Sequence, residues 1–507
     1  MNGLPIGWSE TTLGDIAVWS SGGTPSRAEP SLYSGTIPWF KTGELGPRVL
    51  YESEEHISQS ALAKSSAKIF PKGSVALAMY GATIGRTSIL GVEAATNQAC
   101  AVAIPQAVSA EFLHSFLVSQ ERAFAEAGLG GAQPNISQGI VKAWPVSLPP
   151  ANEQTRIVSK LEELLSDLDA GVAELKAAQR KLARYRQSLL KAAVEGSLTA
   201  EWRQQHTPAE SGAQLLESIL AERRARWEAK QLAKFKEQGK TPPKDWQQKY
   251  PEPTKPDATN LPELPEGWVW AKVHHAGNVQ LGRQRAPQFH TGANMVPYLR
   301  VANVFEDRID VSDVMEMHFS EAEEDVYRLH RNDILLNEGQ SLELIGRSAL
   351  FRDELPRACF TNTLVRFRVE EGVIPDFALA LFLHYMHSGR FRKIASITTN
   401  IAHLGAGRFA EVEFPLPSTE EQAAIVSKLS DSLSSLKDQQ RTISLALKQA
   451  TAQRQNILRA AFAGELVPQD PNDEPASVLL ERICTERAAA AARPSTPRAP
   501  RGRPTKA

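Results

Sequence analysis

The sequence has few of the residues that build covalent cross-links or metal sites. Its 507 residues include only three cysteines, Cys100, Cys359 and Cys484, whose odd number and wide spacing fit neither a disulfide framework nor a local metal motif. The eleven histidines include the pair His274 and His275, but no His-Glu-x-x-His pattern accompanies them. We therefore expect buried or idle thiols, ordinary histidines and no metal bound by this chain.

Long hydrophobic runs and an excess of charge are also missing. No apolar stretch approaches the roughly 18 residues that a membrane span needs, and residues 1–8 lack the basic-then-apolar pattern of a secretory leader. The net charge is only −1, so bulk positive charge does not hold nucleic acid to this chain. The composition predicts a cytoplasmic protein, in which any nucleic-acid binding requires local patches or a basic partner.

Catalytic motifs are absent as well. The chain contains no Asn-Pro-Pro-Tyr or Asp-Pro-Pro-Tyr segment of an amino-methyltransferase. Residues 239–241 (Gly-Lys-Thr) resemble the end of a phosphate-binding loop, but Lys234 stands where the motif needs a glycine and Pro242 follows at once. We expect neither methylation nor nucleotide hydrolysis by this chain itself.

What the sequence does contain is an internal repeat. Residues 148–161 (LPPANEQTRIVSKL) recur as residues 416–429 (LPSTEEQAAIVSKL), and the match continues without a gap, at a constant offset of 268, into residues 454–461. The two halves also open alike, with Gly7-Trp8 and Gly267-Trp268. Between the Gly-Trp opening and the long repeat, weaker sequence matches connect the two halves, and the offset between matched residues varies from one match to the next. This variation indicates one framework with loops of different length.

Each copy of the repeat begins a long segment with helical periodicity. Within residues 153–193, and at the equivalent places of the second copy, apolar residues recur at steps of three, four or multiples of seven. At ~1.5 Å per residue such a helix is ~60 Å long. An apolar stripe of this kind needs a partner stripe, and the other copy is the obvious candidate, so the pattern predicts a coiled coil.

The interiors that precede these helices combine short β-branched runs with glycine and proline, which predicts strands and loops with a few helices. The clearest helices are predicted over residues 110–127 and 375–394. Trp8 and Trp268 could stack on bases, but their equivalent places at the start of each framework favour packing in the core.

Polar loops at matching places in the two interiors carry the candidate DNA-binding residues. Arginine can bind guanine edges or clamp phosphates, and lysine, glutamine, asparagine and small hydroxyls also contact DNA. The candidates are Thr24, Ser26, Arg27, Lys41, Arg86, Gln133 and Asn135 in the first half, and Arg283, Arg285, Arg300, Arg347, Asn400 and Arg408 in the second. For each of them a solvated surface position is the alternative.

The end of the chain holds the string Pro-Arg-Gly-Arg-Pro around Arg501, Gly502 and Arg503. It resembles the core of an AT-hook, which lies in the minor groove of A·T-rich DNA. A disordered solubilising tail is the simpler interpretation, because five residues match easily by chance.

The repeated signature, the paired Gly-Trp openings and the glycines after each long helix, Gly196 and Gly464, together resemble the DNA specificity subunit of type I restriction-modification systems. The resemblance implies an α+β chain of two repeated α/β target recognition domains, separated by two long antiparallel helices that form a coiled coil. Each domain would read one half of a split DNA target, and the helices would set the spacer.

The resemblance also implies partners and cofactors. Two modification (methyltransferase) subunits would supply S-adenosylmethionine chemistry, and restriction (ATP-dependent translocase-nuclease) subunits would use ATP and Mg, while this chain binds no cofactor and catalyses nothing. The exposed helix faces would dock the modification subunits, and the candidate docking residues are Arg156, Lys160, Arg223, Arg224, Arg226 and Trp227. Ala424 stands where Arg156 does, so the two docking sites are not expected to be identical.

On this interpretation the chain divides into seven parts. They are target recognition domain 1 (1–150), a central spacer helix (151–196), a helical extension with a Pro/Lys-rich linker (197–262), target recognition domain 2 (263–417), a C-terminal spacer helix (418–465), a short helical extension (466–492) and a disordered basic tail (493–507).

Three alternatives remain at this point. The chain could serve a related system in which methyltransferase and nuclease share one polypeptide, or it could be a coiled-coil scaffold with no DNA role. An active methyltransferase or nuclease is the third, and the missing motifs argue against it.

Overall fold

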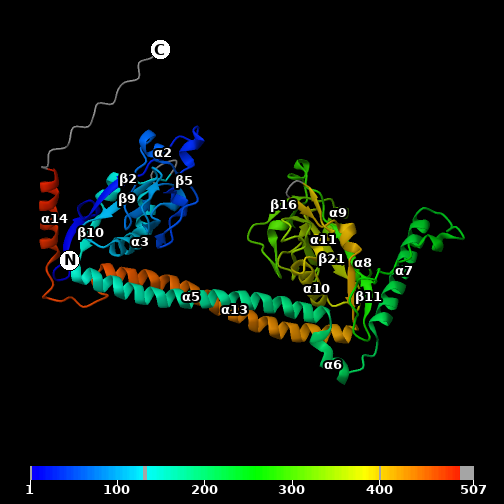
Figure 1. The fold of residues 1–507 in the computed structure, drawn as a ribbon. Helices are drawn as coiled ribbons and strands as arrows, with labels where there is room; N and C mark the ends of the chain where they lie inside the picture. Colours follow the sequence, from blue (N-terminus) through cyan, green and yellow to red (C-terminus); the bar gives the residue numbers. More distant parts are fainter. Residues whose placement is uncertain (1–2, 129–133, 399–400, 492–507) are drawn as a thin grey trace, which may run out of the picture. The chain divides into compact units, whose positions relative to one another are not determined.

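The computed structural model describes residues 3–128, 134–398 and 401–491 (Figure 1). The chain divides into two compact units, which we call unit 1 (residues 1–176 and 444–507) and unit 2 (residues 177–443). Each unit therefore combines one interior domain with parts of both long helices. The Arg501–Arg503 string lies outside the described residues.

Unit 1 is built on a five-stranded sheet with the order β2-β9-β6-β7-β4, in which only the β4–β7 pairing is parallel. A second sheet has the order β5-β3-β8, and β1 pairs with β10. The strands are β1 (Ser9–Thr12), β2 (Ala17–Ser21), β3 (Ile37–Phe40), β4 (Val49–Leu50), β5 (His56–Ile57), β6 (Val75–Ala78), β7 (Thr87–Leu90), β8 (Ala95–Thr96), β9 (Cys100–Pro105) and β10 (Pro145–Leu148).

Unit 2 repeats this framework. Its main sheet has the order β12-β21-β17-β19, its second sheet the order β16-β13-β20, and β11 pairs with β24 as β1 does with β10. Unit 2 adds the hairpin β14-β15 and the small sheet β18-β23-β22. The strands are β11 (Val269–Lys272), β12 (Gly277–Leu281), β13 (Met295–Leu299), β14 (Val304–Phe305), β15 (Arg308–Ile309), β16 (Met315–His318), β17 (Ile334–Asn337), β18 (Gly339–Gln340), β19 (Ser348–Leu350), β20 (Cys359–Phe360), β21 (Leu364–Val369), β22 (Ser396–Thr398), β23 (Ile401–His403) and β24 (Glu413–Leu416).

The helices of the two interiors follow from their sequences. Helix α3 (Ala110–Ala127) matches the predicted range, and its N-cap Ser109 accepts a hydrogen bond from the backbone N–H of Phe112 at 3.1 Å. The prediction over 375–394 was too long, because two helices occupy it, α10 (Pro375–His387) and α11 (Arg390–Ile394). Gly389 (φ +77°) separates them by adopting the left-handed conformation that glycine favours.

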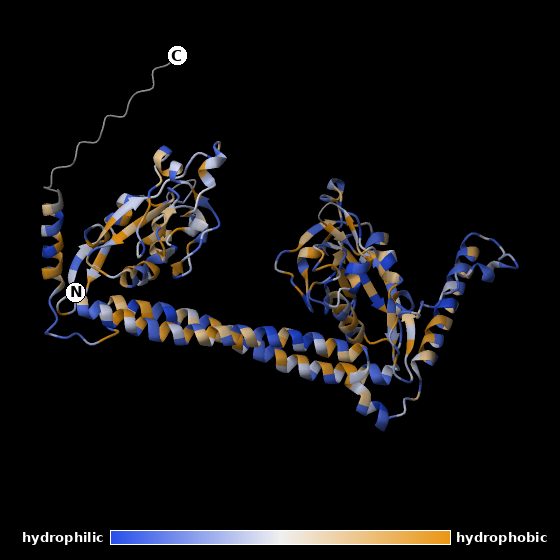
Figure 2. Ribbon diagram, viewed as in Figure 1, coloured by the Kyte–Doolittle hydropathy of each residue, from blue (hydrophilic) through white to orange (hydrophobic). Residues whose placement is uncertain are grey.

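Shorter helices lie between these elements. They are α1 (Leu13–Ile16), α2 (Gln59–Lys64) and α4 (Gln138–Lys142) in unit 1, and α8 (Val273–Ala276), α9 (Glu321–Tyr327) and α12 (Ala406–Ala410) in unit 2. The strands of both main sheets contain many buried apolar residues. The ribbon is coloured hydrophobic along parts of these strands, whereas many loops are coloured hydrophilic (Figure 2).

The two long helices are α5 (Ala151–Val194) and α13 (Thr419–Phe462), each of 44 residues. In unit 1 the beginning of α5 shares a core with the end of α13, through residues such as Ile157, Leu161 and Leu458. In unit 2 the end of α5 shares a core with the beginning of α13, for example Leu190 with Leu429. Start meets end in both units, so the helices pair antiparallel and the coiled-coil prediction is confirmed.

The segment after each long helix packs against the opening of the other half. Gly196 (φ +75°) follows α5, and a Cβ atom there would lie 2.6 Å from Cγ of Pro265. Gly464 (φ +75°) follows α13, and a Cβ atom there would lie 2.5 Å from Cγ of Pro5. The chain then continues into α6 (Ala200–Gln205) and α7 (Gly212–Glu237) in unit 2, and into α14 (Ala476–Ala491) in unit 1.

The glutamate of the repeated Glu-Gln pair accepts a hydrogen bond from the tryptophan that opens each half. The indole N–H of Trp8 donates to Oε2 of Glu153 at 3.0 Å, and that of Trp268 donates to Oε2 of Glu421 at 2.8 Å. Both indoles are buried (7% and 8% exposed), which confirms that they are core residues. Burial raises the pKa of the Glu153 carboxyl, because its charged form has left water.

The Pro/Lys-rich part of residues 197–262, for which we predicted a linker, has defined contacts with the rest of unit 2. It contains the short helix η5 (Trp246–Lys249), whose indole stacks on Trp227 of α7. Further along, Pro262 accepts a hydrogen bond from the indole of Trp270 at 3.3 Å. The composition concealed this order, because the aromatic residues that anchor the segment are few among its prolines and lysines.

Three further observations concern the cysteines, metal binding and membrane-spanning helices. Cys100 and Cys359 are buried and Cys484 is exposed, and all three are free thiols. Within the described residues no group of histidine, cysteine and carboxylate side chains is arranged to hold a metal ion. The described helices include none with both the length and the apolar character of a membrane span.

Candidate nucleic-acid interface

Lys41 and Arg300 occupy equivalent positions in the two units. Each follows a strand (β3 or β13) and precedes a short 3-10 helix, η2 (Thr42–Glu44) or η7 (Val301–Asn303). Each backbone N–H donates to the third residue on, at 2.7 Å to Glu44 and 3.0 Å to Asn303. The framework therefore places one basic side chain at the same point of both units.

In unit 1 this position belongs to a cluster with Arg27. The guanidinium of Arg27 pairs with Glu55 at 2.6 Å, and Nζ of Lys41 lies 3.0 Å from both Glu54 and Glu55. Arg27 and Lys41 lower the pKa of the Glu55 carboxyl by donating to its charged form. Two cations thus face two carboxylates, and the Arg27 side chain remains 57% exposed. Nearby, Thr24 donates to Gln98 and Ser26 is exposed.

A second group of unit 1 surrounds the loop after β6. Arg86 is exposed and follows Gly85, which has a φ of +87°. No described residue makes a hydrogen bond or ion pair with the Arg86 side chain. Asn135 forms a β-bridge with Tyr80, a residue of the same loop that is 47% exposed. Arg86 therefore belongs to the loop between β6 and β7, and Asn135 pairs with another residue of that loop, whereas Gln133 lies outside the described residues.

In unit 2 the equivalent loop carries Arg347. It follows Gly346 (φ +73°), its guanidinium lies 4.8 Å from the ring centre of Phe305, and burial lowers its pKa. Arg408 is exposed and donates to Ser396 at 2.9 Å and to the carbonyl of His403 at 2.8 Å. Asn400 lies outside the described residues.

The remaining candidates of unit 2 lie near the second sheet. Arg300 pairs with Asp313 at 2.6 Å, and Arg285 is exposed with its guanidinium 5.5 Å from the ring centre of Tyr298. Arg283 differs from all the others, because it is only 5% exposed and pairs with Glu323 at 2.8 Å. Its place in the core is structural, so we remove it from the set of candidate DNA contacts.

The small sheet β18-β23-β22 was not predicted from the sequence. Its strands expose Ile397 (63%) and Ile401 (50%), and Arg408 holds β22 to the residue at the end of β23. The two isoleucines lie on the paired strands β22 and β23. The β-branched residues Ile397, Thr398, Thr399 and Ile401 in this short stretch were the available signal.

The candidate docking residues all have partners within the chain. Arg156 pairs with Asp473 at 2.7 Å and Lys160 with Glu163 at 2.8 Å. On α7, Arg223 and Arg226 reach Glu370, Arg224 pairs with Glu252 at 2.9 Å, and Trp227 stacks on Trp246 at 5.9 Å between ring centres.

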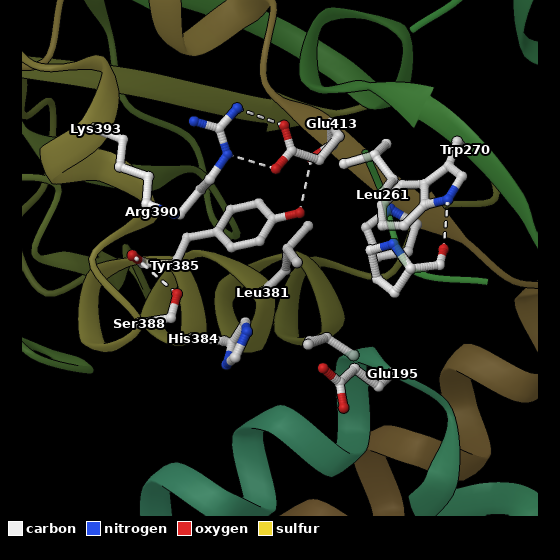
Figure 3. Close-up of a pocket in the computed structure, with 13 residues that line it drawn as sticks. Glu195, Leu261, Trp270, Leu381, His384, Tyr385, Ser388, Arg390, Lys393 and Glu413 are labelled. Carbon is white, nitrogen blue, oxygen red and sulfur yellow. Dashed lines mark hydrogen bonds and ion pairs between the residues drawn. The ribbon is translucent and has the colours of Figure 1, made fainter. Parts of the chain in front are cut away.

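A pocket of about 220 Å³ in unit 2 contains none of the candidate residues (Figure 3). Tyr385 donates to the backbone carbonyl of Glu413 at 3.0 Å, and Arg390 pairs with the carboxylate of the same residue. Burial lowers the pKa of His384 to about 4, so this imidazole is neutral near pH 7. The polar groups of the pocket largely bond one another, which is typical of a packed seam between elements.

Comparisons with known proteins agree with the repeated architecture. A family model described as the type I restriction modification DNA specificity domain matches residues 5–177 and 289–447. The Escherichia coli EcoDI specificity subunit of a type I restriction enzyme is 22% identical over 502 residues, covering 96% of both chains. The EcoKI specificity subunit of Escherichia coli K12 is 23% identical over 507 residues, covering 96% of this chain and 97% of the relative.

A solved chain has the same fold. It comes from a study of complex assembly and conformational transition of the type I R-M system, and it aligns with a TM-score of 0.65 at 15% identity, covering 92% of this chain and 100% of the solved one.

Proposed function

This chain belongs to the family of type I restriction-modification DNA specificity subunits, and we propose that each of its two units reads one half of a two-part DNA target. The observation that carries the proposal is the pair of matching frameworks with different loops. Unit 2 adds the hairpin β14-β15 and the small sheet β18-β23-β22, neither of which is found among the described residues of unit 1. A common scaffold that presents different loops suits two readers of different sequences.

The proposed base and phosphate contacts come from the loops described above. Exposed cations that now pair with carboxylates, such as Arg27 and Arg300, can exchange them for DNA phosphates or guanine edges. The proposed set is Thr24, Ser26, Arg27, Lys41, Arg86, Gln133 and Asn135 in unit 1, and Arg285, Arg300, Arg347, Asn400 and Arg408 in unit 2.

The long helices are proposed to set the spacer between the two half-targets. At ~1.5 Å per residue, a helix of 44 residues is about 66 Å long. Half-sites about one DNA turn apart, ~34 to 36 Å, need a rigid element to hold their readers.

The chain acts, in this proposal, as the non-catalytic part of a cytoplasmic complex. Two methyltransferase subunits that use S-adenosylmethionine dock on it, and through them restriction subunits that use ATP and Mg. The partner subunits also supply positive charge around the DNA, which is consistent with a net charge of only −1 on this chain.

An exchange of one reader tests the modular part of the proposal. Residues 1–149 are replaced by those of a relative, and methylated adenines are then mapped in the genome of a host that carries the altered chain. We expect one half of the methylated sequence to change, while the other half and the partner subunits stay the same. A change in both halves, or in neither, contradicts the proposal.

The native genome provides the control, because its methylated sites give both half-targets and the spacer. Co-purification with this chain shows whether the methyltransferase and the nuclease are separate subunits or one fused partner. A chain without a role in DNA recognition would leave the methylated sequence unchanged in every exchange.

A further inference from the structure

Residues 223–255, which we call the basic arm, differ in charge from the rest of the chain. They contain ten lysines and arginines against four carboxylates, a net charge of +6, whereas the whole chain has a net charge of −1. The other residues therefore carry a net charge of −7. The arm comprises the second part of α7, η5 and the segment that follows η5.

The arm is a folded element of unit 2. The indole of Trp227 stacks on that of Trp246 with ring centres 5.9 Å apart, and it meets the ring of Tyr250 edge to face at 5.4 Å. Phe235 contacts Trp246 from the last turns of α7, with 6.3 Å between ring centres. This aromatic cluster folds η5 back on the helix and keeps both in a defined arrangement.

The arginines and the lysines of the arm have different surroundings. Arg223 and Arg226 pair with Glu370 and so attach the arm to the rest of unit 2, whereas Arg224 pairs with Glu252 inside the arm. The lysines are exposed, and within the described chain none of their side chains has a hydrogen bond or an ion pair. They are Lys230, Lys234, Lys236, Lys240, Lys244, Lys249 and Lys255.

Unit 1 has no such arm among its described residues. Its helix α14 starts like α7, and Arg487 donates to the carbonyl of Gly14 at 3.0 Å as Arg223 donates to that of His274. After Arg487, however, the sequence continues with five alanines in place of the lysines and aromatic residues of the arm. The arm is thus an addition to a shared framework, and the framework does not require its charge.

The surface of the arm indicates which kind of partner it suits. Its aromatic rings pack on one another, and Leu232 (46% exposed) is its one exposed large hydrophobic residue in the described structure. Protein interfaces are depleted in lysine and rely on aromatic and arginine anchors. Unpaired lysines without an apolar anchor suit the phosphates of nucleic acid.

We propose that the basic arm binds the phosphate backbone of duplex DNA outside the bases that the loops read. The contact adds affinity without sequence preference, and it supplies from unit 2 part of the positive charge that the chain as a whole lacks. The inference rests on the proposed function, because it assumes that unit 2 is brought to DNA.

The test removes charge from the arm in the complex purified through this chain from its host. The variant carries Lys234→Gln, Lys236→Gln, Lys240→Gln and Lys244→Gln, and fluorescence anisotropy measures its affinity for a duplex with the methylated target and for a scrambled duplex over a range of salt concentrations. We expect affinity for both duplexes to fall at least about tenfold at low salt, with an unchanged ratio between them. The slope of log affinity against log salt becomes shallower by about 3 to 4, at roughly 0.9 for each phosphate that the arm no longer neutralises.

Two controls separate the arm from bulk charge. Lysine-to-arginine changes at the same four positions should keep the slope of the parent protein. The same removal of charge at Lys64, Lys72, Lys142 and Lys393, which are exposed and lie outside both the arm and the long helices, should leave it nearly unchanged. Thermal unfolding confirms that each variant is folded.

The outcomes that overturn the inference are distinct. An unchanged slope in the arm variant rejects it, as does an equal drop in affinity in the Lys72 control set. Loss of co-purifying subunits with an unchanged slope assigns the arm to a protein partner, and loss of binding to phosphatidylserine vesicles with an unchanged slope assigns it to a lipid surface. A parent protein that does not distinguish the target from the scrambled duplex contradicts the proposed function, whereas the salt slope still decides the role of the arm.

Discussion

In both units a tryptophan–glutamate hydrogen bond joins the opening of the domain to the start of a long helix, and we call this contact the junction. The residues that surround the junction differ between the units. In unit 1, Glu153 accepts from Trp8 at 3.0 Å and from Gln469 at 3.3 Å, both neutral donors. In unit 2, Glu421 accepts from Trp268 at 2.8 Å, from Thr199 at 2.7 Å and from the guanidinium of Arg203. The repeated pair is part of the framework, while the neighbours come from segments that the repeat does not share.

The position of the nearby cation shows how the two junctions diverged. In unit 1 the cation is Arg156, one turn after Glu153, and it pairs with Asp473 instead of the glutamate. In unit 2 the equivalent residue is Ala424, and Arg203 of α6 pairs directly with Glu421. A buried carboxylate can thus be satisfied by neutral donors or by a cation, and the choice sets how much its charge stabilises the fold.

Loss of either tryptophan tests the part that the junctions share. Trp8→Ala and Trp268→Ala each remove a buried indole, and we expect each to lower the free energy of unfolding of its own unit by about 3 to 5 kcal/mol. Hydrogen exchange, read separately from peptides of unit 1 and unit 2, measures the effect. Equal destabilisation of both units by one substitution would contradict the division into two units.

The buried histidines give the two units different stability at low pH. Burial lowers the pKa of His114 in unit 1 to about 4, and burial likewise lowers the pKa values of His275 and His384 in unit 2 to about 4. The unfolded chain takes up protons on these side chains below about pH 6.5, so stability is lost as the pH falls from 6.5 toward 4. Each histidine accounts for up to about 3 kcal/mol, at ~1.4 kcal/mol per pKa unit.

We therefore expect unit 2 to open before unit 1 as the pH falls. Pepsin cleavage at pH 4.5 to 5, followed by mass spectrometry, should release peptides of unit 2 first. The double variant His275→Asn, His384→Asn serves as the control, because it should remove most of the difference between the units. Earlier cleavage within unit 1 would show that other groups control acid unfolding.

The sequence predicted the framework better than the interface. The constant offset and the apolar spacing within residues 153–193 predicted two long helices that pair with each other, because helix pairing depends on periodicity that a sequence displays directly, and the family resemblance implied that the pair is antiparallel. The matched Gly-Trp openings likewise predicted core residues. The helix over 110–127 was correct at both ends because a serine cap and an apolar face mark it.

The features that were not predicted depend on contacts between residues far apart in the sequence. Arg283 was selected as a loop arginine, but its burial against Glu323 and Phe319 depends on segments far away in the sequence. The order of residues 241–264 depends on a few aromatic contacts with α7, which composition does not reveal. The exposed hairpin of β22 and β23 was overlooked because each strand has only three residues.

The smallest expected effect distinguishes the two junctions by charge alone. Glu421→Gln leaves Arg203 (20% exposed) without its carboxylate and turns a charge-assisted contact into a neutral one, so we expect unit 2 to lose about 2 to 3 kcal/mol. Glu153→Gln should cost unit 1 less than about 1 kcal/mol, because its donors Trp8 and Gln469 are neutral. The raised pKa of Glu153 points the same way, since the site favours the neutral form of this side chain.

Urea unfolding followed by hydrogen exchange in each unit measures both variants. A matched pair of controls, Glu153→Asp and Glu421→Asp, keeps the charge and shortens the side chain, and both should destabilise their units because the carboxylate no longer reaches the indole. Equal destabilisation by the two glutamine variants would mean that Arg203 adds nothing to the junction of unit 2. A larger effect of Glu153→Gln would show instead that Arg156 stabilises the charge of Glu153 across the turn of α5, although Arg156 pairs with Asp473.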